Sequence, residues 1–158
     1  MEALMSVIML WLSLTFDLPV ASEYPHVRFV EPPQITALHS GVLAAREHTI
    51  IGIYDSRSRT IFLRDDWDSR NVADVSVLVH ELVHYLEDRV SLRHECAGGR
   101  EALAYDAQQR WLKTFGKDMQ STFGLDAFTL KLRTACSITR RTNGGKVRCQ
   151  PNCRNQRS

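Results

Sequence analysis

The sequence lacks an apolar run long enough to cross a lipid bilayer as a helix, which takes about 20 residues. Its longest uncharged and mostly apolar stretch covers residues 3–16 only. It also lacks an internal repeat, which argues against a repeat architecture. With 158 residues, 44% of them hydrophobic and 24% charged, the composition is that of one globular domain. We therefore expect a single domain with no stable membrane span, and a monomer.

The first residues lack Lys and Arg, although the segment otherwise resembles an export signal. The apolar stretch is followed by Val20-Ala21-Ser22, a small-residue run suited to signal-peptidase cleavage. We interpret residues 1–22 as a signal peptide and predict a secreted or periplasmic protein. Because the segment carries Glu2 and no basic residue, an N-terminal core helix or an uncleaved anchor stays open as an alternative.

Cysteine is absent from the first 95 residues and then occurs four times. An even number of cysteines in an exported chain favours two disulfides, but four cysteines allow three pairings. We expect Cys96 to connect the segment around it to the C-terminal tail, through Cys136 or another tail cysteine. The remaining cysteines are Cys149 and Cys153.

Acidic residues are absent after Asp126, so the tail over residues 136–158 is basic. It lacks the interleaved aromatic residues of many nucleic-acid-binding segments, and we expect no nucleic-acid partner. The folded domain is then predicted to cover residues 23–135.

Hydrophobic spacing predicts a mixture of strands and helices. β-Branched and aromatic residues at 49–54 and 60–63 flank a polar turn and predict a β-hairpin, and residues 27–30 form a further strand candidate. Helices are predicted over residues 71–89, over residues 100–115 after Gly98-Gly99, and over residues 126–134.

The first of these helices contains His80-Glu81-Leu82-Val83-His84. Positions i and i+4 of a helix lie on one face, so both imidazoles can bind one Zn²⁺ at about 2.0–2.1 Å. Glu81 lies beside them, within reach of a zinc-bound water. A solvated surface helix is the alternative, but the apolar residues Val79, Leu82 and Val83 argue against full exposure.

A hydrolytic zinc site needs a third protein ligand and one open position. We select Glu101, which opens the second long helix and can be brought back across the first. An acidic residue in the first turn of a helix is also favoured by the helix dipole without any metal. His94, Glu95 and Asp106 are rival ligands.

These residues resemble those of the zincin metallopeptidases of the gluzincin type, in which a glutamate on a later helix completes the metal site. Zincins with a third histidine carry Gly and His where this chain has Glu87 and Val90, so that subclass is excluded. Residues 49–116, with HELVHYLED and CAGGREALAYDAQQRWL, also resemble small, uncharacterised, secreted bacterial metallopeptidase-like proteins.

The resemblance implies an α+β, zincin-like fold with a small antiparallel sheet, an active-site helix and a second ligand-bearing helix. It implies one Zn²⁺ bound by His80, His84 and Glu101, with Glu81 as the general base. Tyr105 would donate to the oxyanion, although an ordinary half-buried aromatic is an equal alternative. Asp106 or Asp74 would orient a ligating histidine.

Peptide-bond hydrolysis, with a peptide or protein as substrate, is the function that this resemblance implies. A zinc amidase acting on another amide, and a zinc-binding or structural protein without turnover, remain alternatives.

Overall fold

The computed structural model describes residues 1–38 and 51–136 and has an α+β fold, as predicted. The predicted tail therefore lies outside the described residues, apart from Cys136. The elements, in chain order, are α1 (Glu2–Phe16), β1 (His26–Val30), α2 (Pro32–Leu38), β2 (Gly52–Asp55), β3 (Thr60–Arg64), α3 (Val72–Arg89), α4 (Ala97–Thr114), α5 (Met119–Phe123) and α6 (Ala127–Thr134).

The sheet has three strands in the order β1-β3-β2, with β2 at one edge. β2 and β3 form the predicted hairpin and pair antiparallel, whereas β1 pairs parallel with β3. The prediction of an antiparallel sheet was therefore wrong, and the sheet is mixed. β1 is not joined to β3 by a hairpin, because α2 and β2 intervene in the chain, and such a crossover allows parallel pairing.

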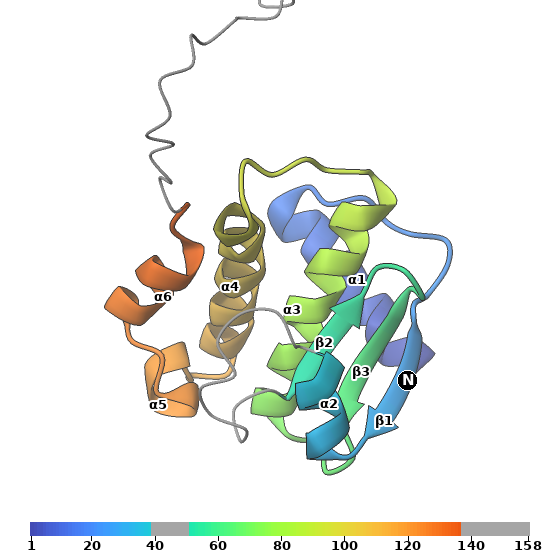
Figure 1. Ribbon diagram of the computed structural model, residues 1–158, viewed down its shortest axis with the longest axis horizontal. Helices are drawn as coiled ribbons and strands as arrows, with labels where there is room; N and C mark the ends of the chain where they lie inside the picture. Colours follow the sequence, from blue (N-terminus) through green and yellow to red (C-terminus); the bar gives the residue numbers. More distant parts are fainter. Residues whose placement is uncertain (39–50, 137–158) are drawn as a thin grey trace, which may run out of the picture.

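Helix α3 lies at the centre of the molecule, and its predicted bounds are confirmed. The side chain of Asn71 caps it by accepting from the N–H of Ala73 at 3.0 Å. Every residue from Val75 to Glu87 is buried, because α1, β2 and α4 pack around it (Figure 1). A helix enclosed on all sides buries polar side chains as well as apolar ones, and such groups need partners.

Helix α4 begins at Ala97, earlier than predicted, and the two glycines lie inside its first turn. The Sγ atom of Cys96 caps this end by accepting from the N–H of Gly99 at 3.2 Å. The same Cys96 forms a disulfide with Cys136, one of the pairings that the sequence left open. Cys149 and Cys153 lie outside the described residues.

Helix α1 covers most of the segment predicted to be a signal peptide. Four of its side chains are buried in the main core, and the ring of Trp11 lies edge-on to that of Trp111 on α4, with centroids 5.2 Å apart. In this structure the segment therefore occupies the place expected of an N-terminal core helix. Its cleavage stays a prediction. The buried residues are Met5, Ile8, Met9 and Leu12.

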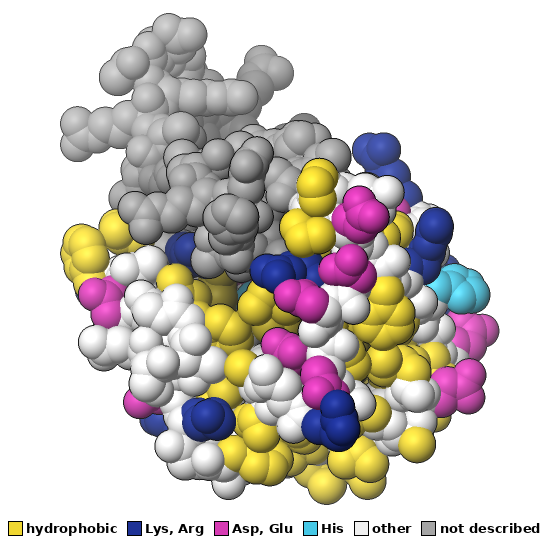
Figure 2. All heavy atoms as spheres, turned by 90° about the horizontal axis from the view of Figure 1, so that it is seen from below, with side chains coloured by type: hydrophobic (Ala, Val, Ile, Leu, Met, Phe, Trp, Pro, Cys, Tyr) yellow, Lys and Arg dark blue, Asp and Glu magenta, His cyan; other side chains and the backbone are white. Residues whose placement is uncertain are grey.

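Among the described helices, none combines the length and the apolar character that a membrane span requires. Basic and acidic side chains alternate with apolar ones on the face shown in Figure 2.

Candidate metal centre

Three potential metal ligands converge where α3 and α4 cross. His80 Nε2 lies 3.2 Å from His84 Nε2 and 3.2 Å from Glu101 Oε2, and His84 Nε2 lies 3.4 Å from Glu101 Oε1. These three residues are the group in the described structure that could hold a metal ion. Both histidines are buried, and Glu101 is half-buried.

The distances between these atoms can be compared with the distances between ligand atoms around a tetrahedral zinc ion. Two ligands at about 2.0–2.1 Å from a zinc ion, at the tetrahedral angle, lie about 3.3 Å apart. The two histidine nitrogens lie 3.2 Å apart, close to this value. Glu101 places one carboxylate oxygen 3.2 Å from His80 and the other 3.4 Å from His84. The three residues could therefore hold one ion between them.

Burial and hydrogen bonds within the group shift the pKa values of His84 and Glu101. Burial opposes charge on His84, but hydrogen bonds to Glu101 and Glu87 outweigh it and raise the pKa of His84 to about 9. Burial likewise opposes charge on Glu101, yet its hydrogen bonds with His80 and His84 hold the pKa of Glu101 far below its usual range.

Glu87 is the carboxylate that contacts the far side of the His84 ring. Its Oε2 lies 3.5 Å from His84 Nδ1, and its Oε1 lies 3.3 Å from His94 Nε2. A carboxylate at Nδ1 favours a hydrogen on that nitrogen and leaves the Nε2 lone pair for a metal. Arg100 lies further away, with its Nε 4.0 Å from Glu87 Oε2.

The prediction that Asp74 or Asp106 orients one of the two histidines was wrong. Asp74 accepts from the N–H of Asp68 at 2.9 Å, and Asp106 pairs with Arg110 one turn along α4. The signal that identifies Glu87 is its position three residues after His84, where side chains on a helix are neighbours.

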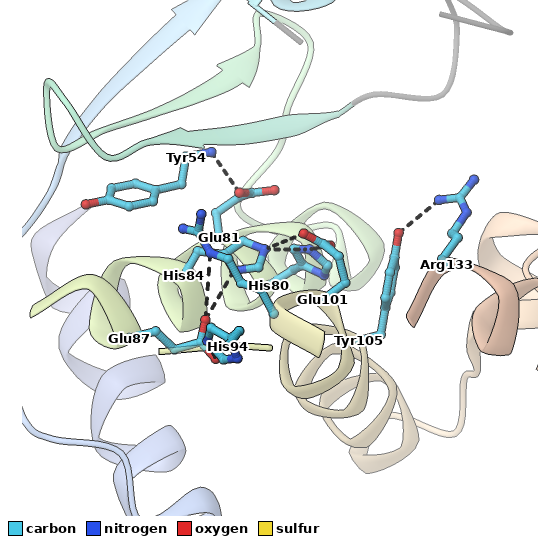
Figure 3. A network of polar contacts seen from close by, with 10 residues as sticks. Tyr54, His80, Glu81, His84, Glu87, His94, Glu101, Tyr105 and Arg133 are labelled. Carbon is cyan, nitrogen blue, oxygen red and sulfur yellow. Dashed lines mark hydrogen bonds and ion pairs between the residues drawn. The ribbon is translucent and has the colours of Figure 1, made fainter. Parts of the chain in front are cut away.

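Glu81 is held by the edge strand of the sheet. The backbone N–H of Tyr54 on β2 donates to Glu81 Oε2 at 2.8 Å, as Figure 3 shows. The strand passes so close to α3 that a Cβ atom on Gly52 would lie 2.7 Å from Val77 Cγ1 and 3.3 Å from Glu81 Cγ. Glycine is therefore required at this position to bring the strand onto the motif helix.

Tyr105 forms another wall of the site. Its ring lies edge-on to that of His80, with centroids 4.7 Å apart and an interplanar angle of 69°. Its hydroxyl accepts a hydrogen bond from Arg133 Nη1 on α6 at 2.9 Å. Burial raises the pKa of Tyr105, and Arg133 partly offsets this. Arg133 could not be identified from sequence, because nothing in the local pattern connects α6 to α4.

The structure thus brings His80, His84 and Glu101 together, with Glu81 and Tyr105 beside them. The rival ligands lie elsewhere: His94 pairs with Glu87, Asp106 pairs with Arg110, and Glu95 is exposed.

Comparison with curated proteins and with solved structures gives no match. A family model described as a domain of unknown function, DUF6647, matches residues 1–141. This match spans most of the chain, including α1 and the whole metal centre, and the chain therefore belongs to the DUF6647 family.

Proposed function

We propose that the protein is a zinc-dependent hydrolase that cleaves peptide bonds outside the cytoplasm. The observation that carries this proposal is the convergence of His80, His84 and Glu101, whose ligand atoms lie within 4.8 Å of one another, beside the buried carboxylate of Glu81. Two histidines and a glutamate are a ligand set of hydrolytic zinc sites, which keep a further position for water.

His80, His84 and Glu101 would hold the zinc, which when bound lowers the pKa of a water molecule and polarises the scissile carbonyl group. Glu81 acts as the general base and receives the proton of the attacking water as the new C–O bond forms. The hydrogen bond from Tyr54 N–H to Oε2 takes up one acceptor position of the carboxylate and leaves the others for this proton. Glu81 then passes the proton to the leaving amine as the C–N bond breaks.

Tyr105 supplies a hydrogen-bond donor for the carbonyl oxygen as negative charge develops on it. Its ring contacts His80, so its hydroxyl lies on the wall of the metal centre. Removal of one such donor typically lowers kcat by about 10²- to 10³-fold.

The position of β2 favours a peptide over another amide as substrate. β2 is an edge strand of the described sheet, and its backbone contacts Glu81 directly. An extended peptide can add to such an edge through main-chain hydrogen bonds. The disulfide agrees with an oxidising compartment, where such bonds persist.

The test combines metal content with cleavage. The full chain, including α1, is equilibrated with zinc, analysed for zinc by elemental analysis and incubated with a peptide library whose products are identified by mass spectrometry. We expect one zinc per chain and cleavage by the parent protein. Glu81→Gln should retain zinc and lower kcat by about 10²- to 10⁴-fold, the usual contribution of a general acid–base.

Glu95→Gln is the matched control, because it makes the same chemical change at an exposed site. It should leave kcat unchanged. A parent protein without zinc would contradict the proposal, and so would a Glu81→Gln variant that cleaves as fast as the parent. Zinc binding with cleavage of non-peptide amides alone would favour an amidase. Zinc binding with no hydrolysis at all would favour a protein without turnover.

A further inference from the structure

Helix α6 is attached to the end of α4 that carries Glu101. The disulfide between Cys96 and Cys136 joins the start of α4 to the residues that follow α6. The backbones also meet directly, since a Cβ atom on Gly98 would lie 2.5 Å from the carbonyl oxygen of Ala135. Figure 1 shows α6 alongside α4. The last turn of α6, which carries Arg133, is therefore fixed relative to the metal centre.

The hydrogen-bond partner of Arg133 is a phenol rather than a carboxylate. Arg100 and Arg110 on α4 lie within ion-pair distance of Glu87 and Asp106. Within residues 1–38 and 51–136, no carboxylate gives Arg133 such a partner, and the sequence has no Asp or Glu after Asp126. The hydrogen bond of Arg133 goes to the Tyr105 hydroxyl instead.

This hydrogen bond determines how the hydroxyl can be used. A guanidinium group only donates, so the Tyr105 oxygen must accept from Arg133. The hydrogen of the hydroxyl is then left for a different acceptor. The contact of the Tyr105 ring with His80 fixes the ring, and Figure 3 shows its hydroxyl level with the Glu101 carboxylate.

We propose that Arg133 is a positioning residue that holds the Tyr105 hydroxyl in place and keeps its hydrogen directed at the carbonyl oxygen of the substrate. The positive charge of Arg133 also polarises the O–H bond and strengthens its donation. This inference rests on the proposed function, because it assigns Arg133 a part in the same hydrolysis. It extends the active site to α6 and, through the disulfide, to the C-terminal side of the domain.

A double-mutant cycle on the full chain tests the proposal. Kinetic constants for the best substrate of the peptide library, and zinc content, are measured for the parent, Tyr105→Phe, Arg133→Met and the double variant. We expect Tyr105→Phe to lower kcat by about 10²- to 10³-fold and Arg133→Met to lower it on the order of 10-fold, since it acts through Tyr105. KM and zinc content should change little. In the Tyr105→Phe background, Arg133→Met should have no further effect on kcat.

Two further variants separate positioning from a structural or charge effect. Arg133→Lys keeps a cationic donor and should restore most of the kcat lost in Arg133→Met. Lys131→Met removes one positive charge from the same helix at an exposed position and should leave kcat unchanged.

An Arg133→Met effect that persists at full size in the Tyr105→Phe background would overturn the inference and show that Arg133 acts independently of Tyr105. Loss of zinc in Arg133→Met, or unchanged kcat, would also overturn it. In each of these cases the parent still cleaves peptides, so the proposed function stands. A parent that binds zinc and cleaves nothing overturns both.

Discussion

The two sides of the metal centre are held in place by different means. The ligand side lies on α3 and α4, the two longest of the described helices, which pack directly against each other, and its histidines are buried. The opposite side consists of Tyr105, which also lies on α4, and Arg133, which lies on the short helix α6 attached by a disulfide. A single hydrogen bond of 2.9 Å joins these two residues. On the proposed function, metal binding therefore depends on α3 and α4, whereas the stabilisation of developing charge depends also on α6. Mutations should be able to affect one without the other.

The largest expected effect is on the ligand side. Replacing His84 or Glu101 by Ala removes one of the three proposed ligands and leaves only two at the crossing of α3 and α4. We expect each variant to lose stoichiometric zinc, as measured by elemental analysis after dialysis, whereas Arg133→Met should keep it. His26→Ala removes an exposed histidine on β1 and serves as the control. Full zinc content in Glu101→Ala would show that the third ligand has been misassigned.

The next effect concerns the opposite side. Replacing Cys96 and Cys136 together by Ser opens a loop with a sequence separation of 40 residues. On a chain-entropy model, closing a loop of that length stabilises the fold by about 4 kcal/mol. We expect the free energy of unfolding, measured by urea denaturation, to fall by up to about this amount.

The same double variant should keep its zinc and lose part of its kcat, because α6 then holds Arg133 less firmly. Loss of zinc from this variant would reverse the comparison, since it would mean that the disulfide supports the ligand side. An unchanged free energy of unfolding would show that the packing of α6 on α4 suffices without the bond.

The grouping of residues on the ligand side could be predicted from sequence because it depends on residues close together in the chain. His80 and His84 are four residues apart, which places them on one face of any helix, and α3 has the predicted bounds. The choice of Glu101 required only that a second helix return across the first. These expectations depend on helical periodicity and short connections, which one sequence can show.

The features that sequence did not reveal depend on contacts between distant segments. The N–H of Tyr54 that holds Glu81 is a backbone group, and no pattern of side chains marks it. Arg133 reaches Tyr105 across 28 positions of sequence. The parallel pairing of β1 with β3 depends likewise on how the chain crosses the sheet. α4 begins before its two glycines because Cys96 caps that end and Gly98 lies against Ala135, a tertiary contact that overrides the low helix propensity of glycine.

Glu87 lies between these two cases, because its position in the sequence is local to His84 but was not recognised as significant. Its substitution gives the smallest of the expected effects. It is nearly inaccessible, with 2% of its surface exposed, and it lies between His84 and His94. Glu87→Gln keeps the size of the side chain but removes the charge that favours a hydrogen on His84 Nδ1. Loss of such a partner typically weakens metal binding by about 10- to 100-fold.

Competition with a zinc chelator at fixed pH would measure this change in affinity, with Glu95→Gln as the exposed control. We expect the Glu87→Gln protein to bind zinc stoichiometrically at high zinc concentration and to show a weaker affinity only in the competition. An affinity equal to that of the parent would mean that the 3.5 Å contact with His84 does not orient the ligand. The contacts of Glu87 with His94 and Arg100 would then be its remaining interactions, and the ligand side would rest entirely on the crossing of α3 and α4.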